Sequence, residues 1–128
     1  MESFKISTSY FAKMRKFPEN AIAISIALFP PKGMNIVSIP ELYPTKEILQ
    51  KYKSDNDCNA YTEAYNKIVL NNLNPTLIIN KIKNIAEANG KNEAILVCYE
   101  KSSDFCHRHL VSEWFRNNGC PCEEWTED

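Results

Sequence analysis

The sequence lacks an excess of charge of either sign, since its 15 lysine and arginine residues nearly balance its 16 aspartate and glutamate residues. Net charge therefore does not indicate nucleic-acid binding, which usually needs a basic surface. The chain also lacks any apolar run near the ~20 residues of a membrane-spanning helix. Its first residues, MESFKISTSYFAKMRKF, contain no apolar core of the signal-peptide kind. We therefore expect a cytoplasmic protein without a membrane partner.

Repeats, low-complexity segments and linkers are also missing from the 128 residues. A chain of this length can bury roughly two-thirds of its unfolded surface, which is enough for a core without staples. Hydrophobic residues make up 44% and charged residues 24%, as in ordinary globular proteins. We expect one domain over residues 1–128. Nothing in the sequence indicates an oligomeric state.

The five cysteines include no Cys-x-x-Cys pair. Without a signal peptide, they are expected to be thiols rather than disulfides. Side chains able to bind zinc cluster late in the chain: Cys106, His107, His109, Cys120 and Cys122. Their spacing is unfavourable, because the two histidines point to opposite sides of one helix. We expect no metal and no cofactor.

Three short segments predict the main strands, at residues 4–8, 21–29 and 94–99. The second is a continuous apolar run, typical of a strand buried on both faces of a parallel sheet. The third is short, apolar and bounded by polar turns, which predicts a central strand. Residues 35–39 and 120–128 can add extended segments.

Four helices are predicted between and after these strands, at residues 45–52, 58–73, 75–88 and 105–118. Thr45, Asp57 and Asn74 are the expected N-caps of the first three. Ser103 or Asp104 is expected to cap the last.

Strands separated by helices predict an α/β fold: a single small layered domain with a mostly parallel central sheet flanked by helices. Ligands of such folds usually bind at the carboxyl ends of the strands. Here that edge comprises residues 7–10, 29–32 and 100–107. The basic segment 11–18 is either a solvated loop or an anion-attracting lid.

The start of the last helix holds the densest set of reactive side chains. Helical phase puts His107 on the inward face and Arg108 at its margin, while His109 points to solvent. Residues 105–107 carry backbone N–H groups without helical partners. Together with the helix dipole and Arg108, these donors predict an anion site that includes Cys106 and His107.

Glu100 and Cys106 are the other candidate catalytic residues, beside His107. Strand alternation puts Glu100 at the carboxyl end of its strand, one step beyond Cys98. Glu100 acts as a general base, orients His107 or Arg108, or forms a salt bridge that fixes the turn. Cys106 is a nucleophilic thiolate or a small packing residue. The cysteine-phosphatase mechanism is disfavoured, because neither Cys98 nor Cys106 has an arginine six positions later.

The strand that ends in Cys98-Tyr99-Glu100-Lys101, followed by Cys106-His107-Arg108, resembles the domain of unknown function 488 family. Leu42-Tyr43-Pro44 and Tyr61-Thr62-Glu63-Ala64-Tyr65 are similar to two helices of that family. The resemblance implies a small α/β fold with a site at Glu100 and Cys106–Arg108, and no settled activity.

One stretch departs from the family pattern. Many relatives carry an acidic residue and an arginine near the end of the second strand, where this chain has Ser25–Pro30. The partner charge would then come from Lys32, or the site binds without catalysing.

Three functions remain open. The first is binding of a phosphate-bearing small molecule or nucleotide at the Glu100/Cys106–Arg108 turn. The second is a hydrolase or transferase acting on a phosphorylated metabolite, nucleotide or nucleic-acid end. The third is a structural polar knot without a ligand.

Overall fold

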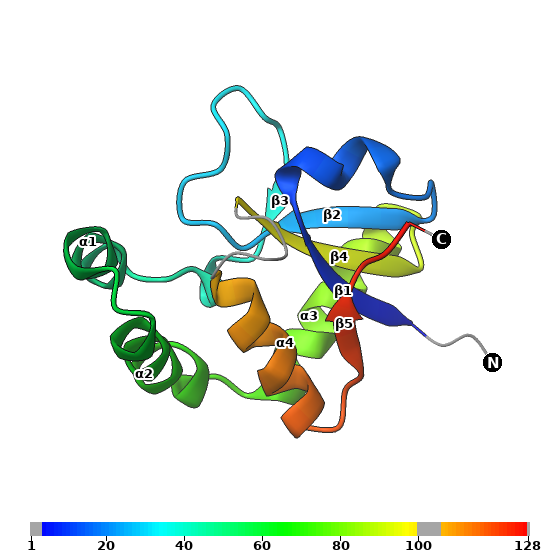
Figure 1. Cartoon of the computed structure of the whole chain (residues 1–128). Helices are drawn as coiled ribbons and strands as arrows, with labels where there is room; N and C mark the ends of the chain where they lie inside the picture. Colours follow the sequence, from blue (N-terminus) through cyan, green and yellow to red (C-terminus); the bar gives the residue numbers. More distant parts are fainter. Residues whose placement is uncertain (1–3, 100–105, 128) are drawn as a thin grey trace.

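The five strands form one sheet in the order β3-β2-β4-β1-β5, and every pairing is parallel (Figure 1). The computed structural model describes residues 4–99 and 106–127. Within these ranges the chain is a small α/β domain whose sheet is flanked by helices, which confirms the predicted fold class. β4, Glu93–Cys98, is the central strand, as its apolar sequence predicts.

The other elements follow the chain in order. The strands are β1 (Lys5–Tyr10), β2 (Ala21–Ser25), β3 (Val37–Ser38) and β5 (Cys122–Glu124). The α-helices are α1 (Lys46–Asp55), α2 (Cys58–Ile68), α3 (Pro75–Ala88) and α4 (His107–Asn117). Short 3₁₀ helices are η1 (Phe11–Lys16), η2 (Pro40–Leu42) and η3 (Leu70–Asn72).

The caps read from the sequence form as expected for the first three helices. Thr45, Asp57 and Asn74 each accept a hydrogen bond from a backbone N–H of the first turn. α3 begins at Pro75, where the missing N–H costs nothing. It is followed by Gly90 with a φ of 70°, the left-handed conformation that glycine adopts without strain.

Several boundaries differ from the sequence prediction, among them those of β2, α2 and α4. β2 ends at Ser25 rather than at residue 29, because the Ser25 hydroxyl accepts a bond from the N–H of Ala27 and turns the chain. The predicted helix 58–73 breaks at Val69 and continues as η3. The last helix begins at His107 with Cys106 as its N-cap, so the assignment of Cys106 to the helix was wrong, while residue 105 lies outside the described residues. The alternative caps Ser103 and Asp104 lie outside the described residues.

One cluster of core side chains lies on one face of the sheet. Ala94, Leu96 and Cys98 of β4 belong to one cluster with buried side chains of all four α-helices. Figure 1 shows α1, α2 and α4 on one side of the sheet and η1 on the other. The longest helix, α3, has 14 residues, and no helix within the described ranges is long and apolar enough to cross a bilayer.

Candidate functional site

The site lies where two neighbouring strands end. β2 and β4 pair in parallel, with Ser25 opposite Val97, so their carboxyl ends meet at one edge of the sheet. The chain leaves β2 through buried Ile26 and Ala27. Cys106, at the start of α4, returns to the same edge. This is the edge at which ligands of parallel α/β sheets usually bind.

A pocket of about 280 Å³ opens at this edge. Its walls come from the chain after β2, from α1 and α2, from the end of β4 and from the start of α4. The lining residues are Ala27, Leu28, Phe29, Pro44, Leu49, Tyr52, Lys53, Tyr61, Cys98, Tyr99, Cys106 and His107. Most are apolar or aromatic, and Lys53 is the one lysine or arginine among them. The volume is near the lower end for small-molecule sites.

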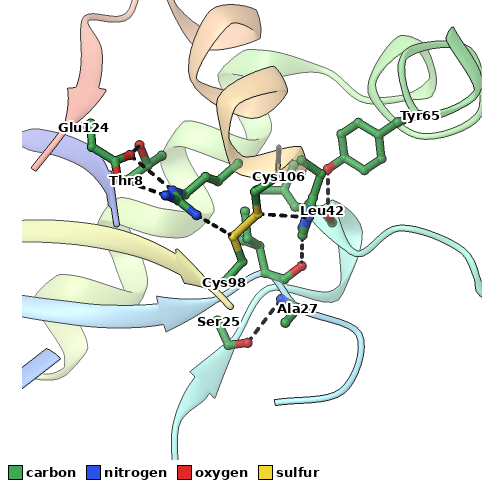
Figure 2. The surroundings of a disulfide bond; sticks show 11 residues. Thr8, Ser25, Ala27, Leu42, Tyr65, Cys98, Cys106 and Glu124 are labelled. Atoms are coloured by element: carbon green, nitrogen blue, oxygen red, sulfur yellow. Dashed lines mark hydrogen bonds and ion pairs between the residues drawn. A yellow bond between two sulfur atoms is a disulfide. The ribbon is translucent and has the colours of Figure 1, made fainter. Parts of the chain in front are cut away.

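Cys98 and Cys106 form a disulfide beside this pocket (Figure 2). The expectation that the cysteines are thiols is thus wrong for this pair, while Cys58, Cys120 and Cys122 are free. That expectation came from the presumed cellular compartment, whereas the pairing comes from topology. The last residue of β4 and the N-cap of α4 meet at the same sheet edge. Both cysteines are almost fully buried, with 1% and 3% of their surface exposed.

His107 is held as a neutral imidazole. Burial is the main cause that lowers the pKa of His107 to about 4; the hydrogen bond to Ile26 opposes the shift, and the charges of Arg108 and His109 add to it. Its Nε2 lies 2.7 Å from the carbonyl oxygen of Ile26, which can only accept, so Nε2 donates. Nδ1 therefore carries the lone pair, and it lies 3.8 Å from Cys106 Sγ. The unprotonated ring nitrogen of His107 therefore faces the sulfur of Cys106.

Arg108 lies deeper than helical phase suggests, since its side chain is fully buried. Its Nε and Nη2 donate to both carboxylate oxygens of Glu124 at 3.1 and 3.0 Å. Nη1 donates to Cys98 Sγ at 3.1 Å, and the guanidinium carbon lies 5.6 Å from the centre of the Tyr10 ring. Thr8 Oγ1 also donates to Glu124, from β1 (Figure 2). The guanidinium thus connects the pocket disulfide to the last strand.

Tyrosine rings connect the pocket wall to His107. The Tyr61 ring stacks near that of Tyr65 at 6.2 Å, and Tyr65 meets the His107 ring edge-on at 5.4 Å. The hydroxyl of Tyr65 donates to the carbonyl oxygen of Leu42 at 2.6 Å. Since Tyr65 is buried and fixed at both ends, it limits movement of His107. Burial raises the pKa of Tyr65, which therefore stays protonated and able to donate.

One group within the described residues has ligand atoms close enough for a metal. Sγ of Cys98, Sγ of Cys106 and a ring nitrogen of His107 all lie within 4.8 Å of one another. While the two sulfurs are bonded to each other, they are not the thiolates that zinc requires. Metal binding here would thus need reduction first. The His109, Cys120 and Cys122 set considered from the sequence forms no such group among the described residues.

The predicted site residues separate into three sets. Cys106 and His107 line the pocket, as their place at the helix start suggests. Arg108 is close by but directs its guanidinium to Glu124 and Cys98. Glu100 lies outside the described residues.

Sequence reasoning missed several contributors. Tyr52, Lys53 and Tyr61 line the pocket from α1 and α2, and the sequence contains no local signal for this because their helices are packed there by the core. Glu124 was also missed as the partner of Arg108. Lys32, the alternative source of charge, is not among the lining residues.

A family model described as "Active DUF488-N3 subclade", DUF488-N3a, matches residues 7–119. Among the described elements, the match leaves out β5 and the first two residues of β1, and it includes every pocket-lining residue. No curated protein and no solved structure matches the chain.

Proposed function

The chain belongs to the DUF488 family, in its DUF488-N3a subclade, and on the basis of its pocket we propose that it binds a small anionic molecule, such as a phosphate-bearing metabolite or a nucleotide. The observation that carries this proposal is the composition of the pocket. Lys53 and the N-terminal end of α4 both face a space that is otherwise apolar and aromatic.

Two features support an anion as the ligand. The dipole of an eleven-residue helix favours negative charge at its N-terminus, and Cys106 and His107 of that end line the pocket. Lys53, an exposed residue in the last turn of α1, also lines the pocket and supplies a positive charge. Arg108, in contrast, supports the site from behind, because Glu124 already occupies its guanidinium.

The aromatic walls support a ligand with a flat apolar portion. Tyr52 and Tyr61 meet edge-on at 5.5 Å on one wall, and Tyr99 and Phe29 lie on another with 49% and 58% of their surface exposed. Exposed aromatic rings at a pocket mouth favour stacking with a planar group. A nucleoside phosphate combines such a group with the anion.

A thermal-shift panel of nucleotides, phosphorylated metabolites and inorganic phosphate tests the proposal. A ligand at 100 times its Kd adds about 2.7 kcal/mol, which raises the melting temperature by roughly 10 °C for a chain of this size. We expect Lys53→Ala to reduce this shift by more than half. The matched control Lys46→Ala changes an exposed lysine at the other end of α1 and should keep it. No shift from any compound, or equal loss in both variants, contradicts the proposal.

A second candidate is a reaction on such a ligand, by a hydrolase or transferase. The description of the subclade as active favours it, as does the lone pair of His107 Nδ1 facing Cys106 Sγ. In the reduced protein Cys106 would be the nucleophile, oriented by a hydrogen bond from its thiol to the neutral ring of His107. His107→Ala that folds correctly, binds the ligand and keeps full turnover would exclude this role.

A further inference from the structure

We propose that Cys98 and Cys106 are a reversible dithiol–disulfide pair that undergoes exchange with a small thiol entering the pocket. The first support is their position. Both cysteines line the pocket, so the disulfide can be reached from it, although little of either residue is exposed to bulk solvent. The inference concerns the sulfur atoms alone and does not depend on the proposed anionic ligand.

The second support is the donor on Cys98. Arg108 Nη1 donates to Cys98 Sγ from a fully buried guanidinium. A cationic donor stabilises a thiolate, and a thiol of lower pKa is the better leaving group in exchange. The contact thus determines which sulfur leaves: Cys98 departs, and Cys106 Sγ is attacked.

The third support is the acceptor on Cys106. The His107 tautomer is fixed by the Ile26 carbonyl, which leaves the lone pair of Nδ1 toward Cys106 Sγ. After reduction, this nitrogen can accept a hydrogen bond from the Cys106 thiol. Each sulfur of the pair therefore has its own partner, one cationic and one basic.

The exchange proceeds in two displacements. A small thiolate attacks Cys106 Sγ, the Cys98–Cys106 bond breaks, and Cys98 leaves as a thiolate beside Arg108. A second small thiolate then attacks the small-molecule sulfur of the mixed disulfide, which releases the oxidised small disulfide and the Cys106 thiolate. Two electrons pass from the two small thiols to the protein, and their two protons are available to the new thiols. The reverse sequence reduces a small disulfide to two thiols and re-forms the Cys98–Cys106 bond.

The other cysteines have no comparable surroundings. Cys58 is exposed on α2, and burial raises the pKa of Cys120 and raises that of Cys122 to about 11. A high thiol pKa leaves little thiolate at neutral pH, so Cys120 and Cys122 are expected to exchange slowly. They provide internal controls in the same molecule.

Equilibration of the full-length protein in glutathione redox buffers, followed by acid quenching, alkylation in denaturant and mass spectrometry, tests the proposal. We expect one reversible two-electron transition between a form with three alkylated cysteines and a form with five. Peptide mapping should assign the difference to Cys98 and Cys106. Cys58→Ser should shift the midpoint ratio by less than about twofold, whereas Cys106→Ser should abolish the transition.

A rate comparison separates an exchanging pair from a structural disulfide. Reduced glutathione should reduce the native disulfide faster, by about tenfold, than the same disulfide in the guanidinium-unfolded chain. This measurement needs no substitution and so does not depend on any variant folding. Slower reduction in the native state would overturn the proposal, as would two cysteines that stay reduced in the most oxidising buffer. One zinc ion retained per chain, with both thiols inert to oxidation, would also overturn it.

Discussion

His107 combines three properties that no single sequence pattern reports together. Its ring is buried, it is neutral at ordinary pH, and both nitrogens have assigned neighbours. The backbone carbonyl of Ile26 orients the ring in the part of the chain where relatives were expected to place charges. Because the acceptor is the backbone carbonyl of residue 26, it can orient the His107 ring whatever the side chain of residue 26 is. The lone pair toward Cys106 is the result, whether the site binds, catalyses or exchanges sulfur.

The depressed pKa of His107 makes folding sensitive to acid. The unfolded chain binds this proton below pH about 6.5 and the folded chain only below about 4. Stability is therefore lost as the pH falls between these values, because the unfolded state then holds more protons. We expect a loss of about 2 kcal/mol from this residue between pH 7 and pH 4.5.

Urea unfolding of the wild type and of His107→Gln at both pH values measures this loss. Glutamine keeps a donor for the Ile26 carbonyl but does not titrate, so the variant should lose about 2 kcal/mol less on acidification. Parallel pH profiles in the two proteins would mean that His107 does not titrate as assigned.

Arg108 and Glu124 are expected to contribute strongly to stability. Glu124→Gln removes the charge that balances a fully buried guanidinium and should cost about 3 kcal/mol of unfolding free energy. Glu123→Gln, on the same strand but exposed, should change it by less than about 0.5 kcal/mol. Denaturant midpoints provide the comparison. Equal midpoints for the two variants would show that the ion pair is not stabilising.

At the scale of elements, the sequence predicts well what is local. Hydrophobic spacing, the Asn74-Pro75 start and the Gly90 turn are properties of neighbouring residues, and the helices they predict are present. The end of β2 was misjudged because residues 26 and 27 remain buried after the strand ends. Apolar composition reports burial there, whereas a hydrogen bond from the N–H of Ala27 to the Ser25 hydroxyl accompanies the end of the strand.

The candidate site is predicted only in part, for the same physical reason. Cys106 and His107 are recognisable because they lie next to each other at a helix start. The other features of the site join residues from different elements. They are the Cys98–Cys106 bond, the Arg108–Glu124 ion pair and the place of Lys53 in the pocket lining. Such contacts are decided when the helices pack on the sheet, and no spacing along the chain specifies them.

The N-cap of α3 should affect stability alone. Asn74→Ala removes the acceptor for the N–H groups of Thr76 and Leu77 and should cost about 1 kcal/mol. Asn74→Ser should restore most of it. Because α3 supplies none of the pocket-lining residues, ligand-induced thermal shifts should be unchanged in both variants. A changed ligand response would show that α3 contributes to the pocket indirectly.

For the whole molecule, the disulfide joins two cysteines that are close in sequence and closes a short loop of the chain. The bonded cysteines are 8 positions apart, so chain-entropy arguments give about 2–3 kcal/mol of stabilisation. Reduction should therefore lower the melting temperature by roughly 10 °C. Scans with and without a phosphine reductant measure this effect. A Cys98→Ser/Cys106→Ser variant should be insensitive to the reductant, and an equal response in that variant would assign the effect elsewhere.

The guanidinium of Arg108 touches the sulfur of Cys98 on one side and the carboxylate of β5 on the other. When Cys98 becomes a thiolate, it competes with Glu124 for the same cation. The ion pair that holds β5 in place should then weaken. β5 is an edge strand that pairs only with β1 among the described strands. Amide hydrogens of residues 122–124 would exchange faster with deuterium in the reduced protein. Reduction of the disulfide would thus change the hydrogen-exchange rate of β5, although β5 supplies no residue to the pocket lining.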